Sequence, residues 1–346
     1  MSYWRPLIQL TLARFREQLR QPEVLFWVFG FPLLLAVALG LAFRNRPPDV
    51  VRVAVEDVAG GGADSLARAL GEGRGLRAVV LPPAEAARRL RQGSVALVVV
   101  PGTPIVYRFD STRTESRIAR LVADDALQRA LGRRDARAVV DRTEMARGAR
   151  YIDFLIPGLL GLNLMGTGMW GMGYAVVDAR KRRLMKRLMA SPMRRSQYLL
   201  SFIVARLVML GPETVVLIGF GMLAFGVPMR GSVLDFAGLV VLGAVCFAGL
   251  GLLTASRART TETANGLMNL VMLPMWILSG VFFSSANFPA AMQPLIQALP
   301  LTALNDALRA VMLDGARLGA VAVPAAICAG WGLVSFAVAL RIFRWS

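Results

Sequence analysis

The stretch VLFWVFGFPLLLAVALGLAF, residues 24–43, has twenty residues and no charge. At about 1.5 Å of rise per residue, one helix of this length crosses the roughly 30 Å hydrocarbon layer of a bilayer. A transmembrane barrel would instead show short strands of alternating polarity, which this stretch lacks. We therefore predict a membrane-spanning helix. The apolar region is longer than that of a cleaved signal peptide, so we interpret it as an uncleaved anchor.

The rest of the chain contains more segments of the same kind, and 55% of its 346 residues are hydrophobic. Five further spans are predicted, at Tyr151 to Val177, about Leu199 to Phe225, Val233 to Ala255, about Asn265 to Phe283 and Gly319 to Phe343. Residues 288–313 are also apolar, but they contain three prolines and cannot form one straight span. We expect short helices there that re-enter the outer face of the membrane.

Residues 44–150 have a different character. Alternating β-branched runs predict strands at 50–57, 76–81, 94–100 and 104–110. Helices are expected at 64–70, at 84–91 and over the long stretch 115–147. The glycines of Gly60 to Ser65 lack the Lys-Ser/Thr of a phosphate-binding loop, which favours a turn. The predicted fold is a polytopic α-helical membrane protein of six transmembrane helices, with an α/β domain between spans 1 and 2.

The short loops predict the orientation of the chain, because basic residues collect on the cytoplasmic side. The loop 178–197 has eight basic residues and one acidic residue, whereas the loop 226–232 has only Arg230. Both termini are therefore expected in the cytoplasm and residues 44–150 outside it. The formal net charge of +18 could suggest a nucleic-acid partner, but reading bases needs a basic soluble face with aromatic or amide side chains. The span pattern leaves no such face, so we expect no nucleic-acid partner.

The residue types that carry much enzyme chemistry are missing. The chain has no histidine, and its cysteines, Cys246 and Cys328, lie in apolar segments. Its only lysines are Lys181 and Lys186, and neither ends a glycine-rich loop. We therefore predict no catalytic residue, no metal site and no bound cofactor in this chain.

The loop DARKRRLMKRLMASPMRR, residues 178–195, is the most informative segment for function. Leu184 and Leu188 form an i, i+4 pair beside a strongly basic face. One interpretation is a topology signal that lies on anionic lipid. The other is a docking helix for a cytoplasmic partner. The loop alone does not choose between them.

Polar residues within spans are costly in hydrocarbon and are candidates for a path or a hinge. Glu213 follows Arg206 by seven residues on one helical face, which fits substrate binding, a polar contact within the helix or between subunits, or an Arg206 that snorkels to the interface. The full set of candidate path, gate or interface residues is Asn163, Arg206, Glu213, Asn269, Pro274, Met275 and Trp276.

Several segments together resemble the permease subunits of ABC-2 type exporters. They are YIDFLIPGLLGLNLMGTGMWGMGYAVVDARKRRLMKRL (151–188), GLMNLVMLPMWILSGVFFSSANFP (266–289), ALPLTALNDALRAVM (298–312) and YRFDSTRTES (107–116). The resemblance implies a connecting helix at residues 1–23, a coupling helix at about 180–190 and paired outer helices at about 288–313. The residues that it assigns to coupling are Arg180, Arg183, Leu184, Lys186, Arg187 and Leu188.

The same resemblance implies a function. Two permease chains, identical or different, would work with separate ATP-binding subunits that hold ATP and Mg²⁺, in the inner membrane of a bacterium. This chain would form the path of a multidrug-efflux-like exporter and would contact membrane lipid. A membrane anchor or sensor, whose outer domain binds a ligand or partner without transport, is the alternative.

Overall fold

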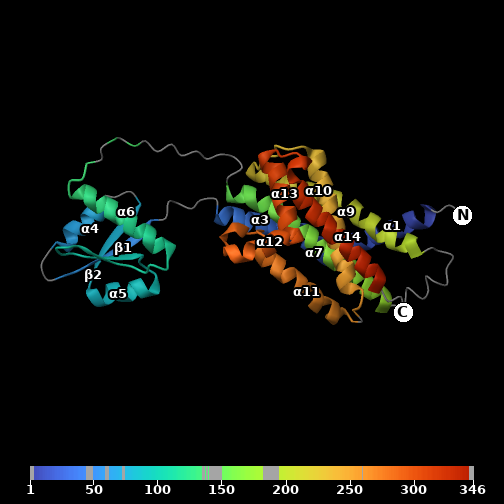
Figure 1. The fold of residues 1–346 in the computed structure, drawn as a ribbon, viewed down its shortest axis with the longest axis horizontal. Helices are drawn as coiled ribbons and strands as arrows, with labels where there is room; N and C mark the ends of the chain where they lie inside the picture. The colour runs from blue at the N-terminus through green and yellow to red at the C-terminus, as the bar shows by residue number, and fades with distance from the viewer. Residues whose placement is uncertain are drawn as a thin grey trace. The chain divides into compact units, whose positions relative to one another are not determined.

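The structure is a computed structural model that describes residues 4–43, 50–58, 62–71, 75–134, 137, 139, 150–181, 195–258 and 260–342. The chain divides into two compact units, drawn in Figure 1. One unit is formed by residues 45–143, and the other by residues 1–44 together with 144–346.

The smaller unit is an α/β sandwich around a four-stranded sheet of order β2-β1-β3-β4. Its strands are β1 (Val51–Glu56), β2 (Leu76–Leu81), β3 (Leu97–Val100) and β4 (Val106–Arg108). The first three strands are parallel, and β4 pairs with β3 in the antiparallel direction. Each strand lies inside a segment that the sequence predicted.

Helices cover both faces of this sheet (Figure 1). They are α4 (Ala63–Gly71), α5 (Pro83–Gln92) and α6 (Thr114–Ala130). Residues of α4 and α6 pack with Val53, Val55 and Leu97 on one face, while α5 packs with Ala54 and Val98 on the other. The predicted helix 115–147 was too long, because α6 ends at Ala130 and Gly132 has a positive φ of 99°, which a helix cannot continue through.

The larger unit is a bundle of helices. The amphipathic helix α1 (Trp4–Leu19) precedes a first span made of α2 (Pro22–Leu25), the π-helical turn η1 (Phe26–Gly30) and α3 (Phe31–Ala42). The longer helices that follow are α7 (Tyr151–Lys181), α9 (Arg195–Phe225), α10 (Val233–Ala255), α11 (Thr261–Leu278) and α14 (Ala322–Ile342).

Five of the described helical segments are long and apolar enough to cross a membrane: Pro22–Ala42, Tyr151–Val177, Val204–Phe225, Val233–Ala255 and Leu318–Ile342. The predicted span at 265–283 corresponds to α11, which has 18 residues and is not among the five. Glu262, Asn265 and Asn269 make this helix less apolar. The sixth span thus remains a prediction.

The stretch 288–313 is broken into short helices, as its prolines predicted. Two single 3₁₀ turns, η2 (Ser285–Asn287) and η3 (Ala290–Met292), lead into α12 (Gln293–Ala298) and α13 (Pro300–Asp314). Pro300 occupies the first turn of α13, where its missing N–H has no helical partner to lose. α13 is largely buried, with Leu301, Leu304 and Leu308 fully covered.

α7 lies at the centre of this unit. It packs against α3, α9, α10, α11 and α13, and its apolar side chains form much of the main core. The approach to α10 is close enough to require glycine, since a Cβ on Gly251 would lie 2.7 Å from the Met169 carbonyl oxygen. A movement of α7 would therefore change its packing against all five of these helices.

Candidate functional site

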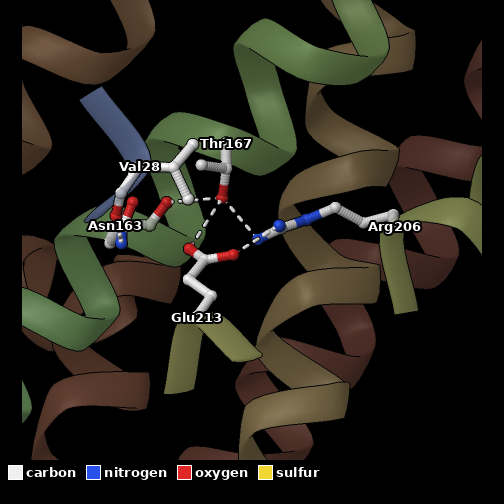
Figure 2. A network of polar contacts seen from close by, with 5 residues as sticks. All are labelled: Val28, Asn163, Thr167, Arg206 and Glu213. Atoms are coloured by element: carbon white, nitrogen blue, oxygen red, sulfur yellow. Dashed lines mark hydrogen bonds and ion pairs between the residues drawn. The ribbon is translucent and has the colours of Figure 1, made fainter. Parts of the chain in front are cut away.

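A buried ion pair lies within α9. Arg206 Nη1 is 2.6 Å from Glu213 Oε2, and the Glu213 side chain is fully covered while that of Arg206 is 15% exposed. The seven-residue spacing places both side chains on one face of the helix, as the sequence predicted. Figure 2 shows them pointing toward each other and toward α7. Arg206 thus pairs within its own helix.

Thr167 of α7 joins this pair to the neighbouring helix (Figure 2). Its hydroxyl accepts a hydrogen bond from Arg206 Nη2. The single hydroxyl proton has two acceptors, the Asn163 carbonyl oxygen at 2.7 Å and Glu213 Oε1 at 3.3 Å. Thr167 was not predicted, because a threonine in a membrane helix commonly bonds its own backbone and gives no distinct signal.

Asn163 extends the network to the first span. Its Nδ2 donates to the Val28 carbonyl oxygen at 2.8 Å. Val28 lies in the π-helical turn η1, four residues before Pro32. Proline has no N–H, so the donor that an α-helix would offer to the Val28 oxygen is missing, and the Asn163 amide supplies one instead. We call Asn163, Thr167, Arg206 and Glu213 the ion-pair network.

A second polar cluster lies where α13 meets α7 and the end of α11. The Arg309 guanidinium donates from Nε to the Phe154 carbonyl oxygen at 3.2 Å and from Nη2 to the Gly280 carbonyl oxygen. Its Cζ is 3.6 Å from the centroid of the Phe154 ring, in a cation–π contact. The nearest recorded carboxylate is Asp306, at 3.6 Å and 53% exposed.

Asn305, one turn before Arg309, belongs to the same cluster. Its Nδ2 donates to the Ser279 carbonyl oxygen at 3.2 Å, so two α13 side chains bind the carbonyl groups that follow α11. Gly161 makes room on α7, because a Cβ there would lie 1.9 Å from Asn305 Oδ1. We call Asn305 and Arg309, with the carbonyl groups of Phe154, Ser279 and Gly280, the carbonyl clamp.

The sequence did not single out the carbonyl clamp. Asn305 and Arg309 were visible as polar residues four apart in an apolar stretch. Their partners are backbone oxygens from segments distant in sequence, and backbone groups leave no trace in the residue types. The only available signal was the polar pair itself, within the proline-broken stretch 288–313.

The remaining predicted residues lie apart from both clusters. On α11, Met275 is buried, whereas Asn269, Pro274 and Trp276 are exposed in this single chain. Arg180 belongs to the last turn of α7. The other predicted coupling residues lie outside the described residues; they are Arg183, Leu184, Lys186, Arg187 and Leu188.

The start of α7 carries one further ion pair. Arg150 donates from its backbone N–H, its Nε and its Nη2 to the Asp153 carboxylate, and Nη2 also donates to the Gly226 carbonyl oxygen at 3.2 Å. The hydrogen bond with Asp153 raises the pKa of Arg150 above its ordinary value. Asp153 lies in the first turn of α7, where the positive end of the helix dipole also favours its negative charge.

Comparison with known proteins places these features in a family context. The probable multidrug ABC transporter permease YbhR of Escherichia coli K12 is 25% identical over 171 residues, which are 49% of this chain and 46% of that protein. The linearmycin resistance permease protein LnrN of Bacillus subtilis is 26% identical over 180 residues, 51% of this chain and 46% of that protein. The alignments thus span about half the length of these curated relatives.

A third relative is nodulation protein J of Bradyrhizobium diazoefficiens, which is 27% identical over 209 residues, 60% of this chain and 77% of that protein. The match to a family model is more extensive. The model of the ABC-2 family transporter protein covers residues 22–341, from the start of the first span to the end of α14. This chain belongs to the ABC-2 family of transporter proteins.

Proposed function

We propose that this chain is the permease subunit of an ATP-driven exporter in a bacterial inner membrane. The observation that carries the proposal is the family match over residues 22–341, which includes every candidate span. Members of this family are transmembrane subunits, and this chain has no lysine in a Walker-type loop. The energy for transport would therefore come from a separate ATP-binding subunit.

The basic loop is the proposed docking site for that subunit. Leu184 and Leu188 would insert into the partner, and Arg180, Arg183, Lys186 and Arg187 would surround them. The loop follows α7 directly in the chain, and α7 contacts both polar clusters. A displacement of the loop would thus act on a helix that packs against α3, α9, α10, α11 and α13.

The proposed transport step is a shift between inward-open and outward-open packings of two permease chains. The ion-pair network holds α7 to the first span and α9, while the carbonyl clamp holds α7 to α13 and the end of α11. These contacts divide the helices around α7 into two groups. Because both sets are anchored on α7, we infer that relative movement of the groups either breaks one set of contacts or bends α7 between Phe154 and Asn163, where Pro157 lies.

The exposed face of α11 is the proposed boundary of the path or of the contact with the second permease. Asn269 and Trp276 lie exposed on it seven residues apart, and Gly266 has open space beside it. Polar side chains on a membrane helix need a protein or water partner. This requirement supports α11 as a sixth span that faces the path or the second permease. Six spans place both termini on one side, and the basic loop 178–197 favours the cytoplasm for them and the outside for the α/β unit.

Reconstitution with an ATP-binding subunit tests the proposal. The full chain is co-expressed with an ATP-binding subunit encoded beside it, and co-purification, ATP hydrolysis and ATP-dependent uptake into inverted vesicles are measured. The double variant R183Q/R187Q should lose the partner, whereas R257Q/R259Q, with the same charge change in another basic loop, should keep it. Transport that persists with an ATPase-dead partner would refute the ATP-driven mechanism.

The sensor or anchor alternative rests on the α/β unit, which has its own hydrophobic cores. A partner that binds but whose ATP hydrolysis drives no uptake would favour that alternative. The names of the three relatives refer to multidrug transport, linearmycin resistance and nodulation. We propose an amphipathic or hydrophobic substrate for this chain, to be tested first with a panel of such compounds in the vesicle assay.

A further inference from the structure

Two arginines stand side by side in the sheet of the α/β unit. Arg52 of β1 and Arg77 of β2 are register partners in the parallel pair. Neighbouring strands are about 4.8 Å apart, and register partners point to the same face. Both side chains are exposed, and no ion pair to either is recorded among the described residues. Like charges in this position destabilise a sheet, so the pair needs another explanation than stability.

The same end of the sheet receives further arginines from α5. This helix follows β2, covers the face that carries Ala54 and Leu81, and leads through Gly93 into β3. The Ala96 N–H donates to the Arg52 carbonyl oxygen at 2.9 Å, so the segment after α5 adjoins Arg52. Arg88 and Arg91 lie exposed on the last turns of α5. We call Arg52, Arg77, Arg88 and Arg91 the arginine edge.

Ordinary helix electrostatics account for part of this edge only. The carbonyl end of a helix attracts cations, which suffices for Arg91 in the last turn of α5. Arg89 has Glu85 as an ion-pair partner at 2.6 Å. Neither effect applies to Arg52 and Arg77, which repel each other across two strands. Two adjacent guanidinium groups are suited to a phosphate group, which accepts paired hydrogen bonds from arginine.

A short linker connects the arginine edge to the first span, and therefore to lipid headgroups, which carry phosphate. The first candidate span ends at Ala42, and β1 begins at Val51, so nine residue steps separate them. A chain of that length extends about 32 Å at most. The α/β unit is thus tethered within reach of lipid headgroups, and basic side chains gain affinity near an anionic bilayer. We propose that the arginine edge binds anionic phospholipid headgroups.

The test uses the full chain in nanodiscs and needs neither a transport substrate nor an ATPase, so it is independent of the proposed function. Ser94, exposed beside the arginine edge, is changed to cysteine and labelled with a fluorophore in a C246A/C328A background. The nanodiscs contain phosphatidylcholine alone or mixed with phosphatidylglycerol, with a trace of headgroup-quencher lipid. Quenching then reports how often the edge lies at the headgroups.

We expect stronger quenching with phosphatidylglycerol, and a loss of this increase in 0.5 M salt, where charge interactions are screened within about 5 Å. The variant R52Q/R77Q should lower the ratio of bound to free states about thirtyfold, since each arginine contributes roughly fivefold. The matched variant R134Q/R137Q, which removes two exposed arginines elsewhere in the unit, should leave quenching unchanged.

Folding is checked separately by hydrogen exchange of β1 and β2. Because R52Q/R77Q removes a like-charge pair, protection there should be kept or increased. Equal quenching in the two lipid compositions would overturn the proposal. Equal losses of quenching in R52Q/R77Q and R134Q/R137Q would also overturn it, because they would indicate a general charge effect. So would an increase in quenching with phosphatidylglycerol that persists in R52Q/R77Q.

Discussion

The ion-pair network and the carbonyl clamp both hold α7, but they stabilise a buried arginine in different ways. Arg206 faces a fully buried carboxylate, Glu213, whereas Arg309 faces backbone oxygens, an aromatic ring and a half-exposed carboxylate. The first arrangement depends on keeping both charges. The second depends on where the backbone of α7 and the end of α11 lie. The network should therefore be sensitive to the loss of either charge. The clamp should instead be sensitive to the positions of α7 and the end of α11 relative to α13.

The largest effect is expected from breaking the network at its anion. Glu213→Leu leaves Arg206 buried without its carboxylate, and such a loss costs about 3–5 kcal/mol of unfolding free energy. The measurement is equilibrium unfolding of the purified chain in mixed micelles. The double variant R206M/E213L removes both charges and should recover most of that loss. If the double variant is as unstable as the single one, charge compensation is not what the network provides.

The clamp should respond less strongly to loss of its cation. Arg309→Met removes hydrogen bonds to the Phe154 and Gly280 oxygens but leaves no buried anion behind. The expected loss is about 2–3 kcal/mol, since hydrogen bonds from a charged donor contribute more than neutral ones. Asp306→Asn, measured in the same unfolding assay, should change stability by less than about 1 kcal/mol, because Asp306 is half exposed. A larger effect of D306N would make the clamp an ion pair like the first.

A glycine substitution separates geometry from charge. Gly161→Ala places a Cβ that overlaps Asn305 Oδ1, so the Asn305 side chain or α13 has to shift and the unfolding free energy should fall by about 1–3 kcal/mol. Gly166→Ala is the matched control on the same helix, since nothing lies within 4 Å of its added Cβ. Unfolding of the two variants side by side is the measurement. Equal stability of both would show that α7 and α13 do not need this close fit.

The smallest effect is expected from removing a hydrogen bond between two side chains in the α/β unit. Tyr107 Oη donates to Asp124 Oδ1 at 3.0 Å, and Tyr107→Phe should cost about 1 kcal/mol. Burial and then the Asp124 carboxylate raise the pKa of Tyr107 to about 12. A raised folded pKa means that this stabilisation is complete below pH 10 and is lost as the pH rises through 12. The tyrosinate absorbance of the parent minus that of Y107F should therefore titrate near pH 12; a midpoint near 10 would contradict the burial of this hydroxyl.

Local patterns predicted the secondary structure well. The alternating runs gave each strand of the sheet, and the uncharged runs gave the long helices. The error at α6 came from helix-favouring residues that continue past Ala130, where Gly132 takes a conformation that sequence propensity does not reveal. The prolines correctly predicted that the stretch 288–313 would not be one straight helix. Local patterns did not show that α13 would be almost wholly buried.

The site was predictable only where both partners lie on one helix. Arg206 and Glu213 are two turns apart on α9, so helical geometry was enough to bring them together. Thr167, Asn305 and Arg309 find their partners on other elements, across separations of 26 to 155 residues. Such contacts depend on packing, which one sequence does not encode in any local period.

The hydrogen bond from Asn163 to the Val28 oxygen also has a consequence for membrane insertion during synthesis. The two residues are 135 positions apart, so at about 5–20 residues per second the first span is made roughly 7–27 s before its donor. Until then the Val28 oxygen lacks both the α-helical donor that Pro32 removes and the amide of Asn163. The second span thus supplies a hydrogen-bond donor that the first span lacks. Pro32→Leu restores the backbone donor, so the double variant P32L/N163L should insert into the membrane better than N163L alone. Pulse-chase measurement of membrane integration would show this rescue, and equal integration defects with and without Pro32 would rule it out.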